Sequence, residues 1–140
     1  MNETTRLDEL TELAAKLPRL SAHTSKRAQP ATGDGVEVAA LVLADLVDLG
    51  LAGHFNAALG KVHGGAGQRC WIETKDGWVL DVHSGQTNIA PVGEFYASTG
   101  ADCQKKLGAE EFVVMVLKSM KGNAGALSSD DVFRRAGMST

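Results

Sequence analysis

Between Gly67 and Gln86, the sequence GQRCWIETKDGWVLDVHSGQ places a cysteine, an aspartate and a histidine within one apparent hairpin. If Asp76-Gly77 forms a two-residue type I′ turn, Cys70 faces His83 across the hairpin, and Asp81 lies on the same side. A thiolate stabilised by an imidazolium and oriented by a carboxylate is a nucleophile suited to acyl chemistry. The hairpin therefore predicts a candidate catalytic cluster of Cys70, His83 and Asp81.

The same residues also have a structural interpretation. Cysteine is among the most buried residue types and packs as a small hydrophobic group, and strands that alternate such residues commonly form a core. A shift of one residue in the hairpin register would move Cys70 and Asp81 to opposite faces. Cys103, in GADCQKK, is interpreted as a packing residue or a free thiol. Both interpretations of the hairpin stay open at this point.

Around the hairpin, apolar residues recur at helical spacing over residues 7–17, 36–49 and 110–120. Gly50 is expected to end the second helix, and Ser128 to cap a last short helix in LSSDDVFRRAG. Extended pieces are expected in GHFNAALGKV, on both sides of Asp76-Gly77, and from Val92 to Tyr96. This order predicts an α+β domain in which a main helix packs on a small antiparallel sheet with flanking helices.

The 140 residues are expected to form a single domain. Its expected parts are an N-terminal helix and loop (1–31), a helix plus antiparallel hairpin core (32–103), and C-terminal helices (104–140). The chain is 44% hydrophobic and 22% charged, which is typical of a globular protein. Because the net charge is -3 and no basic stripe is present, nucleic-acid binding is disfavoured.

A membrane location is also disfavoured, because the longest apolar run is too short to span a bilayer and the first residues contain no signal-peptide core. The two cysteines show no CxxC spacing, and thiols without a secretion signal are expected to be reduced, which indicates the cytoplasm. The four histidines form no HExxH or HxxxH pair, so neither a metal nor another cofactor is expected. Among them, His63 could approach the hairpin as a base, although a solvated loop histidine is the commoner case.

A family resemblance covers roughly Thr32 to Gln86. RCWIETKDGWVLD resembles the His-Ala-Trp-hydrophobic-Glu … Gly-Trp … Asp signature of transglutaminase-like domains, which belong to the papain-like cysteine-enzyme superfamily. TGDGVEVAALVLADLVDLGLAGHFNAALG is similar to that family's segment in which a cysteine opens a helix that leads to a strand. The resemblance implies a papain-like (transglutaminase-like) fold with a cleft between the helix and the hairpin.

Carried across residue by residue, the resemblance gives an incomplete triad. The nucleophile position falls on Gly35 and the histidine position on Arg69, while Asp81 has the expected type. Glycine has no nucleophile, and arginine cannot act as a base near neutral pH. Asp81 is then expected to be structural and to accept hydrogen bonds from the neighbouring strand or from Arg69. The resemblance also implies room for a thiol at Gly35, whereas a backbone that needs a positive φ would exclude any side chain.

Three hypotheses for function follow. The leading one is a transglutaminase-like domain that has lost catalysis and binds a peptide or protein partner through the ancestral cleft. The second is an active thiol-dependent amide hydrolase, deamidase or acyl-transferase that uses Cys70, His83 and Asp81. The third is an unrelated small protein-interaction domain. The sequence leaves the oligomeric state open, and the residues expected to line the cleft are Gly35, Arg69, Trp71, Trp78 and His63.

Overall fold

The structure is a computed structural model, which describes residues 8–13, 35–62, 68–83 and 86–137. A short helical segment spans residues 8–13. The elements that follow it are α3 (Val36–Asp48), η1 (Ala52–His54), β1 (Phe55–Lys61), β2 (Gln68–Thr74), β3 (Trp78–His83), β4 (Gln86–Pro91), α4 (Val92–Thr99), β5 (Asp102–Gly108), α5 (Ala109–Gly122) and α6 (Ser129–Arg135).

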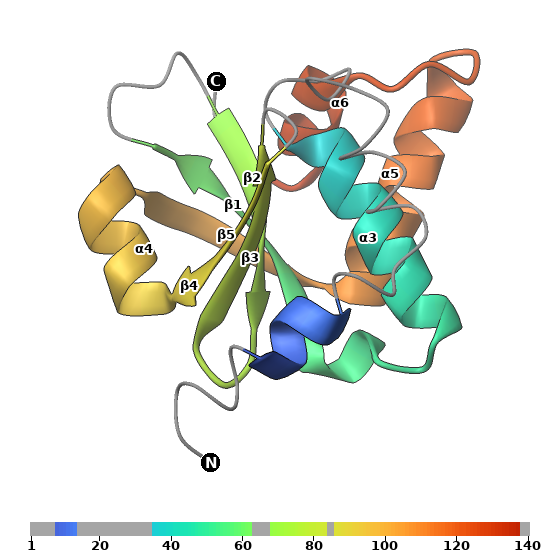
Figure 1. Cartoon of the computed structure of the whole chain (residues 1–140). Coiled ribbons are helices and arrows are strands. Elements are labelled where there is room, and N and C mark those ends of the chain that lie inside the picture. Colours follow the sequence, from blue (N-terminus) through green and yellow to red (C-terminus); the bar gives the residue numbers. More distant parts are fainter. Residues whose placement is uncertain (1–7, 14–34, 63–67, 84–85, 138–140) are drawn as a thin grey trace.

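The five strands form one antiparallel sheet in the order β4-β3-β2-β1-β5. Helices α3, α5 and α6 cover one face of this sheet, and α4 lies on the opposite side (Figure 1). The predicted α+β class is therefore confirmed, as is the packing of a main helix, α3, on the sheet.

Each face of the sheet has its own apolar cluster, because side chains alternate between the faces along a strand. On the side of α3 and α5, Cys70 and Ile72 of β2 pack with residues such as Leu43, Leu46 and Phe112. On the side of α4, Trp71 of β2 packs with Ala58, Val79 and Phe95. Strand β2 is thus covered on both faces over residues 70–74, all of which are buried.

Most of the predicted helices are present. The stripe of apolar residues in 36–49 forms α3, and the one in 110–120 forms α5. The side chain of Ser128 accepts a hydrogen bond from the amide of Asp131, so the predicted cap of α6 is confirmed. Of the segment predicted as a helix at residues 7–17, the part that the structure describes, residues 8–13, is helical.

The prediction of a strand from Val92 to Tyr96 is wrong. These residues begin α4, which follows Pro91 and ends at Gly100. The true strands on either side, β4 and β5, were not predicted. In β5 only Leu107 is buried, so its sequence DCQKKLG lacks the alternation by which strands are recognised.

Within the described parts of the chain, none of the helices combines the length and the apolar character needed to cross a membrane.

Candidate functional site

The hairpin of β2 and β3 has a register that differs by one residue from the predicted one. Ile72 pairs with Leu80 and Glu73 pairs with Val79, so three residues, Lys75 to Gly77, connect the strands. The hydroxyl of Thr74 accepts a hydrogen bond from the amide of Trp78 at 3.0 Å, which stabilises this longer loop. Gly77 has a φ of 95°, which suits the left-handed position of a three-residue loop. The two-residue turn predicted from Asp76-Gly77 is therefore wrong.

This register separates the residues of the predicted catalytic cluster. Cys70 is 1% exposed and packs in the apolar cluster on the side of α3. The carboxylate of Asp81 instead bonds to Arg69, the neighbour of Cys70 on β2, whose side chain points to the opposite face. The prediction that Cys70 and Asp81 share a face is wrong, because the extra residue in the turn shifts every pair.

The side chains of the two predicted site histidines, His83 and His63, cannot be placed relative to Cys70 and Asp81. His83 pairs with Gln86 through its backbone in the β3–β4 ladder, and its side chain lies outside what the structure describes. His63 falls outside the described residues altogether.

Arg69 and Asp81 form the ion pair that was expected of a structural aspartate. The guanidinium nitrogen Nη2 lies 2.8 Å from Oδ1 and 3.1 Å from Oδ2 of the carboxylate. The side chains are 15% and 9% exposed, so the pair is largely shielded from water. The predicted hydrogen bond from Arg69 to Asp81 is confirmed, and each side chain is the ion-pair partner of the other.

Gly35 precedes the first residue of α3 and packs directly against the backbone of β2. Its φ is 87°, and a Cβ atom at this position would overlap the carbonyl oxygen of Cys70. A side chain would therefore meet both an unfavourable backbone conformation and fixed backbone atoms. The room for a thiol that the resemblance implied at Gly35 is not present.

The expected cleft is filled where the structure describes it. The cavity bounded by Gly35, Cys70 and Asp81 has a volume of about 10 Å³, which is the space of a single water molecule at most. Trp71 and Trp78 are 1% and 7% exposed and pack in different clusters, on opposite faces of the sheet. These tryptophans are core residues and form no common wall for a ligand.

A second polar cluster, around Glu73, was not predicted. The carboxylate of Glu73 is 2% exposed. Its Oε2 accepts hydrogen bonds from the indole nitrogen of Trp71 at 2.8 Å and from the hydroxyl of Tyr96 at 2.5 Å. Its Oε1 lies 2.9 Å from the ammonium nitrogen of Lys106. We call Glu73, Trp71, Tyr96 and Lys106 the Glu73 network; it joins β2, α4 and β5.

The charges in the Glu73 network stabilise one another. Burial alone would raise the pKa of Glu73, but the hydrogen bonds from Tyr96, Lys106 and Trp71 outweigh it and hold the pKa below its ordinary value. The pKa of Tyr96 is raised, because of burial and the hydrogen bond to the Glu73 carboxylate. The pKa of Lys106 is also raised, because of its hydrogen bond to Glu73. These shifts favour an ionised Glu73, a protonated Tyr96 and a charged Lys106, which are the forms that the hydrogen bonds of the network need.

In the sequence, Glu73 aligns with the glutamate of the signature that RCWIETKDGWVLD resembles, and no partner was predicted for it. A signal was present, because a glutamate between the apolar residues Ile72 and Trp78 must find partners if the strand is buried. Its partners, Tyr96 and Lys106, come from segments whose secondary structure was predicted wrongly or missed.

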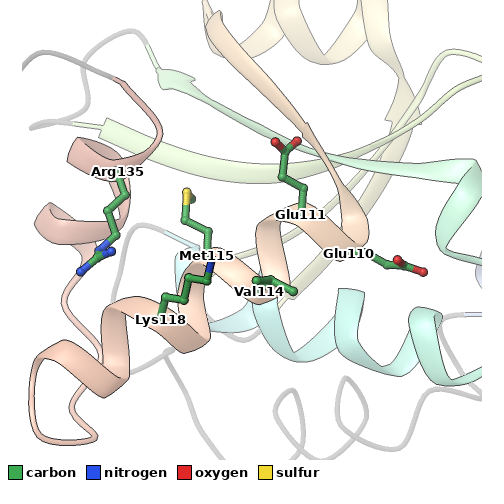
Figure 2. A pocket seen from close by; sticks show the side chains of 6 residues that line it. All are labelled: Glu110, Glu111, Val114, Met115, Lys118 and Arg135. Carbon is green, nitrogen blue, oxygen red and sulfur yellow. The ribbon is translucent and has the colours of Figure 1, made fainter.

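Another cavity lies on the C-terminal helices α5 and α6. It is a groove of about 580 Å³ lined by Glu110, Glu111, Val114, Met115 and Lys118 of α5 and by Arg135 of α6 (Figure 2). The Nε of Arg135 donates to Asp131 at 2.8 Å, and the hydroxyl of Ser119 donates to the same carboxylate at 2.6 Å, so α6 is tied to α5 beside the groove.

Comparisons with known proteins add no relative: no family model matches the chain, and no curated protein or solved structure matches it. Among the described residues, no group of three or more histidine, cysteine, aspartate or glutamate side chains is placed to hold a metal ion.

Proposed function

We propose that this chain is a transglutaminase-like domain that has lost catalysis and serves to bind a protein partner. The supporting observation is the ion pair of Arg69 with Asp81. These are two of the three positions onto which the family's triad is carried, and they lie in direct contact from separate strands. The third, Gly35, packs against the backbone of Cys70, which adjoins Arg69. A histidine and an aspartate of the family would need the same proximity.

The same proposal accounts for the closed geometry. Without a nucleophile, the N-terminus of α3 has no side chain to accommodate, and in the proposed papain-like arrangement it has closed onto β2. The arginine keeps its charge at all ordinary pH values, so it can bind the aspartate but cannot take a proton from a thiol. In the proposed ancestor, the aspartate at position 81 oriented a catalytic base. In this chain, its ion pair with Arg69 joins β3 to β2.

An active thiol enzyme is less well supported. The sulfur of Cys70 packs among apolar side chains, and its described polar neighbour is the carbonyl oxygen of Trp71 at 3.9 Å. A substrate carbonyl would have to displace core residues to reach it. Because the ancestral cleft is filled, the partner surface is expected on the exterior, where the groove between α5 and α6 offers apolar and charged groups together.

Thiol labelling tests the loss of catalysis. In a Cys103→Ala variant, Cys70 is the single thiol, and we expect iodoacetamide to modify it slowly at neutral pH and quickly once urea unfolds the chain. The matched Cys70→Ala variant reports the behaviour of the half-buried Cys103. Rapid labelling of native Cys70 well below the ordinary thiol pKa of about 8.5 would overturn the proposal, because it requires an accessible thiolate.

A further inference from the structure

Helix α5 exposes two apolar residues among charged ones on the side that faces away from the core. The helix buries Ala109, Phe112, Val116 and Ser119. On its opposite side, by the 3.6-residue period of a helix, lie Glu110, Val114, Leu117, Lys118 and Lys121, which we call the outer stripe. All five are exposed.

The apolar members of the outer stripe are unusually open to water. Val114 is 49% exposed and Leu117 is 59% exposed. They sit three residues apart, so their side chains form one patch on the helix surface. Such a patch costs free energy in water and is a common mark of an interaction surface when charged groups surround it.

Charge is distributed along this surface with opposite signs at the two ends. Glu110 and Glu111 lie at the N-terminal end of α5, while Lys118 and the α6 residue Arg135 lie at the other end of the same groove (Figure 2). Glu111 and Lys118 are seven residues apart, or about 10 Å along a helix. The groove between them has Val114 and Met115 as its apolar lining.

We infer that this surface binds a second copy of the chain, with the two α5 helices antiparallel about a two-fold axis close to Val114. That arrangement sets Glu110 and Glu111 of each copy against Lys118 and Arg135 of its partner, whereas a parallel arrangement would oppose like charges. The same patch then serves both copies, as two-fold symmetry requires. The inference rests on the proposed function and names its protein partner.

The exposed Leu117 supports the same pairing. Leu117 is on the outer stripe and does not line the groove. A two-fold axis close to Val114 sets the Leu117 side chains of the two copies on the same side of the helix pair, where each can cover the other. Helix-to-helix contacts of this kind bury an exposed leucine without any change in the fold.

The helix dipole explains only part of this pattern. Acidic residues near an N-terminus and basic residues near a C-terminus stabilise a single helix, so the charges alone would not require a partner. The dipole gives no reason for Val114 and Leu117 to be exposed between them. An interface built on one helix is smaller than the roughly 1,200–2,000 Å² of stable complexes, so we expect a dimer that dissociates on dilution.

Sedimentation velocity over a range of protein concentrations tests the inference. The wild-type chain should shift from monomer to dimer as concentration rises, and the shift should weaken at high salt, which screens the charge pairs. Glu111→Lys and Lys118→Glu should each raise the dissociation constant at least about tenfold, because two symmetry-related contacts turn repulsive. Glu94→Lys, on α4 across the sheet, is the matched control and should leave association unchanged.

Mixing the two variants sharpens the test. In a heterodimer of Glu111→Lys with Lys118→Glu, every residue 111 again faces a residue 118 of opposite charge, so the mixture should associate although neither variant does so alone. Circular dichroism of each variant verifies that α5 still folds. A wild-type chain that stays monomeric at all concentrations, or a dimer indifferent to both variants, would overturn the inference. Either result would leave the labelling test of lost catalysis untouched.

Discussion

The hairpin carries two buried carboxylates, Glu73 and Asp81, which differ in how they are neutralised. Glu73 has three donors, from a tryptophan, a tyrosine and a lysine on three different elements. Asp81 is held by the guanidinium of Arg69, from the adjacent strand. A search for chemistry in the sequence selects Asp81, yet the denser polar network surrounds Glu73. A buried carboxylate on a strand thus indicates a structural partner before it indicates a catalyst.

Replacement of Glu73 should have the largest effect. Glu73→Leu leaves the indole of Trp71 and the hydroxyl of Tyr96 without their acceptor and the Lys106 ammonium without its counter-charge. We expect a loss of about 3–5 kcal/mol in the free energy of unfolding, which urea denaturation measures. Glu94→Gln, at an exposed position on α4, is the control and should change stability by less than about 0.5 kcal/mol. A loss for Glu73→Leu no larger than that of the control would contradict a stabilising network.

Replacement of Asp81 should cost less, because fewer described donors depend on it. We expect Asp81→Ala to lower the free energy of unfolding by about 1–3 kcal/mol. Arg69→Ala should have a similar effect, and the double variant should lose clearly less than the sum of the two, since both changes remove one interaction. Full additivity in this double-mutant cycle would show that the pair is not energetically coupled. A loss of some enzymatic activity without any loss of stability would instead give Asp81 a catalytic role.

Acid should produce the smallest effect and should act through Glu73. Because the pKa of folded Glu73 lies below its ordinary value of 4.5, its contribution to stability is present above pH 4.5 and is lost as the pH falls through the folded pKa. The difference in urea midpoint between the wild type and Glu73→Gln should therefore shrink below pH 4.5. A difference that stays constant from pH 7 to about pH 3 would show that Glu73 gains nothing from being ionised in the fold.

The parts of the fold that could be predicted are those in which one periodic pattern dominates. In α3 and α5 the apolar stripe is long and continuous, and in β2 and β3 aromatic and branched residues flank an Asp-Gly turn. Helix α4 was predicted as a strand because Val92, Phe95 and Tyr96 favour strands when taken alone. Tertiary packing decides otherwise, since Phe95 packs against Trp71 from a helix, with ring centroids 5.5 Å apart.

The candidate site could be predicted only in part, because it depends on register. The family resemblance led to the prediction that Asp81 accepts hydrogen bonds from the neighbouring strand or from Arg69, and the second of these donors is present. Placing Cys70 needed the number of residues in the turn, which the hydrogen bond from the amide of Trp78 to the hydroxyl of Thr74 helps to stabilise. Such a bond from a side chain to the backbone leaves no periodic trace in the sequence, and it reverses the face of every residue that follows.

The outer strand β5 has a consequence for how the folded chain behaves in a crowded solution. Among the described residues β5 is the last strand of the sheet, and an edge strand can template edge-to-edge growth, as exposed strands do in aggregation. Two features oppose this: the exposed Lys105 places a charge on β5, and the β1–β5 pairing skips Gln104 in a bulge between Leu59 and Gly60. Desolvating that charge against another strand would be costly, and the bulge bends the edge away from a flat template. Fibril-like extension of the sheet is thereby discouraged at β5.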